Sequence, residues 1–185
     1  MHFHSSLLLL VSLTLTAARS PKDGADPANN LHFITKEVRD HIADNYISLW
    51  DGNYDIINST FSPDFTMLYQ DRFPTGLGNG SVLSDVDSRA AFLAFVQRGR
   101  AAFSQYEFKV VRKFGEDNVI AIRWILDAVY KGGFPLATLA PGASLSYNGT
   151  DTLTLDPSSG LVVEVWSAQD LMNLFHQLGA PVGTL

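Results

Sequence analysis

The side chains best suited to chemistry lie near the end of the chain, around Asp170. Residues 161–166 form an apolar run rich in β-branched residues, which predicts a buried strand. Apolar residues then recur at helical spacing until Gly179 ends the pattern. Asp170 therefore falls in the first turn of a short helix, beside the apolar end of a strand.

Asp170 has two interpretations. Ser167 and Asp170 match a capping box, in which Ser167 caps the helix and the carboxylate reaches back toward the strand. Alternatively, Asp170 is an acid or base at the rim of an apolar pocket. Burial would raise the pKa of its carboxyl group and the helix N-terminus would lower it, so the residue types alone leave both interpretations open.

Histidines offer a second source of acid–base chemistry. His41 falls on a predicted helix near its apolar stripe, as a possible partner in catalysis or as a half-buried structural residue. His176 is expected near the surface. The chain has no cysteine, and beyond residues 1–18 it has no H-x-H or H-E-x-x-H pattern, so we expect neither a metal site nor thiol catalysis.

Arg123 and Asp127 fall on one face of a predicted strand, four residues apart. A cross-sheet ion pair is the simpler interpretation. The alternative is a set of groups that positions a water, as in an epoxide hydrolase. Tyr69 and Tyr130 have the hydroxyl group needed to donate a hydrogen bond to a substrate carbonyl.

Composition and the N-terminus limit the setting. The 185 residues are 46% hydrophobic and 17% charged with a net charge of −6, which suits one globular domain and makes a nucleic-acid partner unexpected. Residues 1–18 resemble a secretory signal peptide, and residues 19–30 a flexible lead-in. We therefore expect a secreted or secretory-pathway protein without a membrane anchor after signal removal. Three N-glycosylation motifs, at Asn58, Asn79 and Asn148, agree with this setting.

The predicted elements, helices first and strands afterwards, indicate an α+β fold. Helices are expected at 31–50, 54–61 and from Ser88 onward, and strands at 65–70, 106–114, 119–130, 144–155 and 161–166, with a long loop at 71–87. We expect a curved antiparallel sheet with the N-terminal helices on its concave face, which together enclose a cone. Aromatic candidates for its lining and for substrate binding are Trp50, Tyr69, Trp124, Tyr130 and Trp166, although most of them are expected to be ordinary core. On the open face of the sheet, a stripe of Leu161, Val163 and Val165 would suit a homodimer.

Four segments, taken in order, resemble the SnoaL-like branch of the NTF2-like superfamily over residues 31–185. They are the corner Trp50-Asp51-Gly52-Asn53-Tyr54, the strand entry Ser62-Pro63-Asp64-Phe65, the hairpin of residues 114–124, and the ending with Glu164-Val165-Trp166, Asp170 and Gln177-Leu178-Gly179. Two departures stand out. The family often has Asp directly after the tryptophan of its ending, where this chain has Ser167, and the loop at 71–87 is longer than usual.

The resemblance implies a pocket for a small hydrophobic molecule and chemistry without metal or cofactor. Family reactions include aldol-type ring closure, isomerisation, dehydration and epoxide opening. We therefore expect an isomerase or cyclase acting on a polyketide- or terpenoid-like metabolite, with Asp170 as the catalytic group and His41 as a candidate partner. A ligand-binding protein without catalysis and an epoxide hydrolase-like enzyme are the alternatives.

Overall fold

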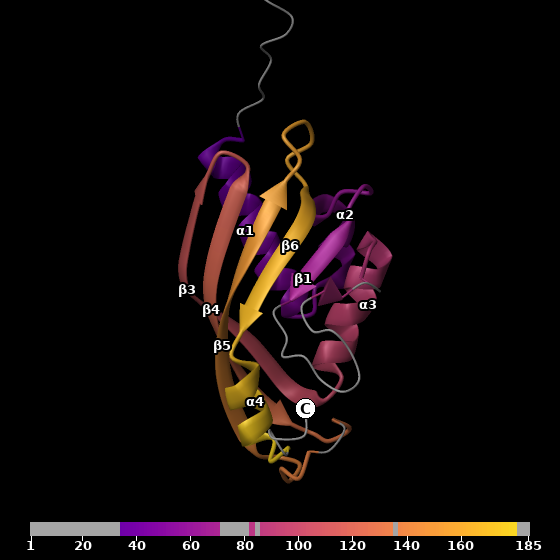
Figure 1. Cartoon of the computed structure of the whole chain (residues 1–185), viewed down its shortest axis with the longest axis vertical. Helices are drawn as coiled ribbons and strands as arrows, with labels where there is room; N and C mark the ends of the chain where they lie inside the picture. Colours follow the sequence, from indigo (N-terminus) through magenta and orange to yellow (C-terminus); the bar gives the residue numbers. More distant parts are fainter. Residues whose placement is uncertain (1–33, 71–81, 84–85, 135–136, 181–185) are drawn as a thin grey trace, which may run out of the picture. The chain divides into compact units, whose positions relative to one another are not determined.

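A computed structural model describes residues 34–70, 82–83, 86–134 and 137–180 (Figure 1). Its helical elements are α1 (Lys36–Trp50), η1 (Tyr54–Ile56), α2 (Ile57–Thr60), α3 (Arg89–Arg100) and α4 (Leu171–Gln177). Its strands are β1 (Met67–Gln70), β2 (Val82–Leu83), β3 (Phe103–Glu116), β4 (Val119–Tyr130), β5 (Ser144–Leu155) and β6 (Val162–Gln169). None of the helices in these ranges is long and apolar enough to cross a membrane.

The described strands form one sheet in the order β2-β1-β6-β5-β4-β3. The run from β3 to β6 is antiparallel throughout, whereas β1 joins β6 in parallel and β2 pairs with β1 antiparallel. Helix α1 contacts β3 and β4 and lies behind the curved sheet in Figure 1. The prediction of an α+β fold with a curved, mainly antiparallel sheet covered by helices is confirmed.

Strict alternation fixes which face of the sheet becomes the core. In β4 the even positions from Ile120 to Tyr130 are buried, as the sequence predicted. In β5 the odd positions from Leu145 to Leu155 are buried and face the helices. We call this buried face the inner face and the opposite one the outer face.

The helices present apolar stripes to the inner face. Helix α1 begins after Thr35, whose side chain accepts a hydrogen bond from Val38 N at 3.4 Å, so the part of the predicted helix at residues 34–35 is not helical. Ser88 caps α3 as predicted. Aromatic rings then fill the space between helices and sheet, among them Phe61 and Phe92 with centroids 4.4 Å apart.

A register shift in β6 changes which of its residues face inward. Opposite Thr154 and Leu155, β6 carries one extra residue, so Val162 and Val165 are both fully buried. The predicted stripe of Leu161, Val163 and Val165 on an open face is therefore wrong at Val165. The homodimer itself stays a prediction.

Candidate active site

One carboxylate lies deep between the sheet and α1. Asp151 sits at an inward position of β5 and is 1% exposed. Its Oδ2 accepts hydrogen bonds from the Tyr46 hydroxyl and from Trp124 Nε1, each at 2.9 Å, and its Oδ1 accepts one from the Ser167 hydroxyl. The donors come from α1, β4 and β6, so this carboxylate joins four elements of the fold.

Burial raises the pKa of the Asp151 carboxyl group to about 6. The hydrogen bonds from Ser167, Tyr46 and Trp124 favour the charged form and limit that rise. The group is thus mostly ionised at pH 7 but can take up a proton near neutrality. A carboxylate of this kind is suited to act as a general base and then as an acid.

Neighbouring residues hold the donors in place. Trp124 lies directly opposite Gly149 of β5, and a Cβ at position 149 would come within 2.3 Å of the indole Cζ2 atom. Only glycine therefore leaves room for this ring. On the other side, Gln169 Nε2 donates to the Ser167 hydroxyl at 2.9 Å, which orients that hydroxyl toward Asp151.

Trp50 lies beside this group of residues. Its ring stacks on Phe108 with centroids 5.5 Å apart, and Phe108 packs against Trp124 at 4.6 Å. The Trp50 side chain is 6% exposed. Its indole N–H is the buried side-chain polar group that has no hydrogen-bond partner in the described part of the chain.

Asp170, the predicted catalytic group, is not in an apolar cavity. It is exposed and is itself the N-cap residue of α4, with its carboxylate accepting a hydrogen bond from Asn173 N at 3.1 Å. The expected position inside the cone is wrong. The capping interpretation is right in kind but wrong in detail, because Ser167 belongs to β6 and points to Asp151 instead of capping the helix.

The other acid–base candidates are also outside. His41 is exposed on α1 with its Nε2 3.2 Å from Asn45 Nδ2, so its predicted place in the cavity is wrong. His176 is exposed, as expected.

The aromatic candidates divide between the two faces. Trp50, Trp124 and Tyr130 are buried on the inner side, and the Tyr130 hydroxyl accepts a hydrogen bond from Phe134 N at 3.1 Å. Trp166 is wrong as a cavity residue: it is 47% exposed on the outer face and donates to Glu164 Oε1 at 2.6 Å. The Tyr69 side chain lies outside the described residues.

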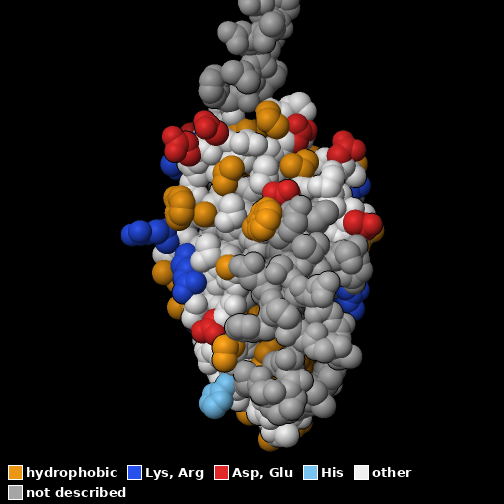
Figure 2. Space-filling view, in the orientation of Figure 1, with side chains coloured by type: hydrophobic (Ala, Val, Ile, Leu, Met, Phe, Trp, Pro, Cys, Tyr) orange, Lys and Arg blue, Asp and Glu red, His pale blue; other side chains and the backbone are white. Residues whose placement is uncertain are grey.

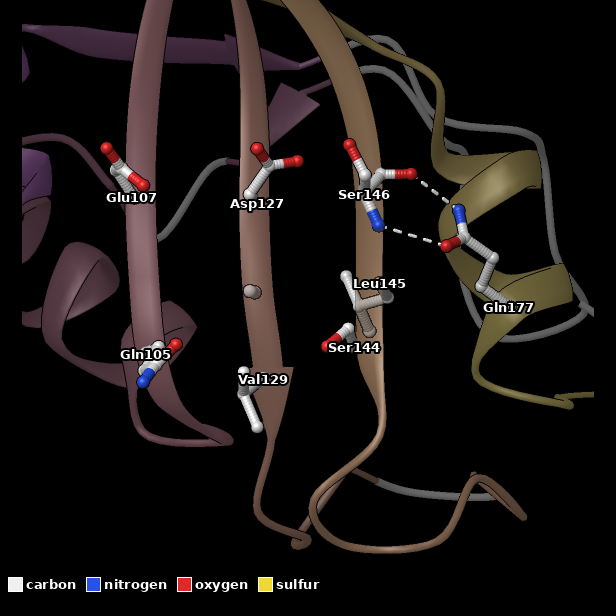
Figure 3. Close-up of a pocket in the computed structure, with 9 residues that line it drawn as sticks. Gln105, Glu107, Asp127, Val129, Ser144, Leu145, Ser146 and Gln177 are labelled. Atoms are coloured by element: carbon white, nitrogen blue, oxygen red, sulfur yellow. Dashed lines mark hydrogen bonds between the residues drawn. The ribbon is translucent and has the colours of Figure 1, made fainter.

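The outer face carries a polar hollow of about 520 Å³ between the lower ends of β3, β4 and β5 and helix α4 (Figure 3). Glu107, Asp127 and Ser146 line it from three neighbouring strands, and the Gln177 amide bonds to both backbone groups of Ser146. This hollow lies on the opposite face of the sheet from Asp151. Figure 2, in the orientation of Figure 1, shows charged and apolar side chains scattered over the upper part of the molecule's visible face.

The predicted ion pair between Arg123 and Asp127 does not form. Asp127 instead accepts from Lys109 Nζ at 2.7 Å, a contact that lowers the pKa of the aspartate. Arg123 donates to the side chains of Asn148 and Thr150. Both residues face outward, so they cannot act together with Asp151 on one substrate.

Sequence reasoning missed Asp151, although a signal was present. In residues 144–155 the odd positions are Leu, Tyr, Gly, Asp, Leu and Leu, so one aspartate interrupts an otherwise apolar strand face. A charged residue at such a position is rare unless it is paired. Among the residues that the structure describes, no three His, Asp or Glu side chains come close enough together to hold a metal ion.

Comparison with known proteins identifies the family of this chain and structures with a similar fold. The family model described as a SnoaL-like domain matches residues 38–165. No curated protein matches the chain at a significant level of similarity. Among solved structures, AclR of Streptomyces galilaeus, for which a hydroxylase role has been suggested, shares 21% identity with a TM-score of 0.62, over 78% of this chain and 83% of that chain.

Two further structures are similar to this chain. IdmH of Streptomyces antibioticus, a suggested polyketide cyclase, shares 17% identity with a TM-score of 0.61, over 77% of this chain and 99% of its own. A suggested SnoaL-like polyketide cyclase from Jannaschia sp. CCS1 shares 19% identity with a TM-score of 0.61, over 78% and 94%. At these identities the likeness establishes the fold.

Proposed function

Because the chain belongs to the family of SnoaL-like domains, we propose that it is a cofactor-independent isomerase or cyclase. Its substrate is a hydrophobic polyketide- or terpenoid-like metabolite that carries a carbonyl group. One observation carries this proposal: the buried Asp151 carboxylate, with a pKa raised to about 6, lies among aromatic side chains. The cyclase roles suggested for IdmH and the Jannaschia protein support the same reaction class.

In the proposed reaction, ionised Asp151 removes a proton from a carbon next to the substrate carbonyl. The C–H electron pair moves into the enolate, and the proton stays on the carboxyl group until it returns to another atom of the product. Tyr46 and Trp124 both donate to Oδ2, and Ser167 occupies one lone pair of Oδ1. The second lone pair of Oδ1 is therefore the position left to accept the substrate proton.

Hydrogen–deuterium exchange into a hydrophobic ketone tests the acid–base step without knowledge of the natural substrate. The probe is 2-tetralone in deuterated buffer, followed by NMR. Wild-type protein should accelerate exchange next to the carbonyl, with a rate that rises with pH through about 6 as Asp151 ionises. The Asp151→Asn variant should lose a factor of about 10² to 10⁴, the usual worth of general base catalysis.

The matched control is Asp170→Asn, which changes an exposed carboxylate outside the interior and should leave the exchange rate unchanged. The proposal would be contradicted if Asp151→Asn accelerated exchange as much as wild-type protein does, or if wild-type protein did not accelerate it.

A ligand-binding protein without catalysis is the second candidate, and one observation favours it. Three of the four lone pairs of the Asp151 carboxylate are already taken by protein donors, as in a purely structural carboxylate. Binding of 2-tetralone by a protein that does not accelerate exchange would support this alternative.

We also propose that the protein acts after export. The apolar run of residues 7–15 and the glycosylation motifs support this setting. Asn58 is exposed on α2 and Asn148 is half-buried on the outer face, whereas Asn79 lies outside the described residues. Material secreted by a eukaryotic host should lose apparent mass after glycosidase treatment, and Asn58→Gln should lower that loss. Intracellular, unmodified protein would contradict the proposal.

A further inference from the structure

The N–H of Trp50, which has no hydrogen-bond partner among the residues that the structure describes, calls for a physical explanation. A buried donor without an acceptor costs free energy, because it has lost its hydrogen bonds to water and gained none in the protein. Trp50 is 6% exposed, so its indole N–H is out of reach of bulk solvent. Phenylalanine would fill much of the same space without this cost.

Aromatic rings surround Trp50. It stacks on Tyr106 and Phe108, and it meets Tyr46, Phe92 and Phe95 edge to face. The Tyr46 hydroxyl is near enough for the indole N–H to oppose the rise in the Tyr46 pKa that burial causes, yet no hydrogen bond forms between the two groups. That hydroxyl donates its own hydrogen to Asp151.

Trp50 thus lies close to both aromatic donors of Asp151. It contacts Tyr46 directly, and Phe108 alone separates it from Trp124. The interior therefore places an ionisable carboxylate and a free N–H donor within the same group of rings. Abstraction of a proton next to a carbonyl needs both a base and a donor for the oxygen that gains negative charge.

We propose that the Trp50 N–H binds an oxygen of the ligand, so the site selects hydrophobic molecules bearing a carbonyl or enol oxygen over hydrocarbons of the same shape. This inference rests on the proposed function for the role of Asp151, but it concerns binding and needs no turnover. During proton transfer, Asp151 acts on the carbon while Trp50 holds the neighbouring oxygen. Tyr46, Trp124 and Ser167 position the carboxylate.

A matched pair of ligands tests the inference: 2-tetralone, and tetralin, which lacks the oxygen. The chain has three tryptophans, so protein labelled with ¹⁵N at the indole nitrogens should give three N–H resonances. Trp124 and Trp166 donate to carboxylates and serve as internal references. The resonance of Trp50, identified by its absence in Trp50→Phe, should move downfield with 2-tetralone and stay in place with tetralin.

Dissociation constants should show the same preference. One neutral hydrogen bond corresponds to roughly a fivefold to tenfold tighter Kd for the ketone. This ratio should fall to about 1 in Trp50→Phe, and it should persist in the control Trp166→Phe, which alters an outer-face tryptophan. The shift itself is read in wild-type protein. If Trp50→Phe folds poorly, Trp166→Phe and Trp124→Phe identify the other two indole resonances and leave that of Trp50.

Equal affinity of wild-type protein for the two ligands, an unmoved Trp50 resonance, or binding of neither ligand would overturn the inference. So would a preference that persists in Trp50→Phe. The exchange assay separates this result from the proposed function. If the protein prefers the ketone but does not accelerate exchange, only the catalytic proposal is contradicted. If exchange depends on Asp151 but the ketone is not preferred, only the role of Trp50 is contradicted.

Discussion

Asp151 and Asp170 are two aspartates of neighbouring segments with opposite surroundings. Asp151 is buried in β5 and receives three side-chain hydrogen bonds. Asp170 is exposed before α4 and receives one hydrogen bond to its side chain, from the backbone of Asn173. Asp151 combines burial with a raised pKa, so the position best suited to acid–base chemistry is the one with the weaker local signal.

The origin of the donors explains this difference. The donor to Asp170 lies three residues away in the chain. Those to Asp151 lie 105, 27 and 16 residues away, in Tyr46, Trp124 and Ser167. A cap is therefore a local structure, whereas the environment of Asp151 exists only once α1 and three strands have assembled.

Exchanging Asp151 with its cross-strand partner gives the largest expected effect. Asp151 pairs directly with Ser167, the position where the resembling family often has aspartate. Ser167→Asp alone should place two carboxylates in one buried site, and Asp151→Ser alone should lose about 10² or more in exchange rate. The double variant should recover at least about tenfold over Asp151→Ser, because the Cβ atoms of directly opposite residues lie only about 4.5–5.5 Å apart and a carboxylate at position 167 can reach the same donors. Recovery is measured with 2-tetralone, and its absence would show that the carboxylate must come from β5.

The pH dependence of stability should report the raised pKa of Asp151. The pKa of Asp151 is about 6 when folded, against about 3.9 for an unfolded aspartate. Between these two pKa values the Asp151 carboxyl group is protonated in the folded state and ionised in the unfolded state. The contribution of Asp151 to the free energy of unfolding therefore falls as pH rises. The loss is about 3 kcal/mol in total, complete above pH 6.

Urea unfolding of wild-type protein and Asp151→Asn from pH 4 to pH 7.5 measures this contribution. The stability of wild-type protein relative to Asp151→Asn should fall over that range. A constant difference between wild-type protein and Asp151→Asn would contradict the raised pKa.

Gly149→Ala should disturb the support of Asp151 without touching the carboxylate. The new Cβ would lie 2.3 Å from the Trp124 ring, so the indole must move and its bond to Asp151 must weaken. We expect a loss of about 1–3 kcal/mol, the usual cost of overpacking, by urea unfolding. Gly99→Ala in helix α3 is the control. Its new Cβ would make an ordinary 3.7 Å contact with the ring of Trp50, and the change should be stabilising because alanine favours a helix over glycine. Equal stability of the two variants would argue against a tight fit around Trp124.

Asp170→Ala should have the smallest effect. Removing the N-cap of α4 should cost about 1 kcal/mol, because Asn173 N loses its acceptor. Asp170→Ser keeps a capping oxygen and should cost little. The measurement is urea unfolding together with the exchange assay, where neither variant should change the rate. A large loss of exchange activity in Asp170→Ala would return this residue to the active site.

Local patterns alone were sufficient for much of the fold. The bounds of β4 and β5 and the alternation along β4 followed from the spacing of apolar residues. The start of α3 followed from Ser88. These features depend on neighbours within a few residues, so the sequence by itself determined them, and together with the family-like segments they indicated the α+β fold.

Only the tertiary structure decided the candidate site. The extra residue in β6 shifts the alternation, so Val165 and Ser167 face inward while Trp166 faces outward. Periodicity within one strand does not reveal such a bulge, because the bulge is defined by its pairing with β5. The pKa of Asp151 likewise depends on burial and on donors from three other elements. The sequence by itself determines the types of the side chains and the local secondary structure, whereas long-range packing determines which groups surround a buried charge.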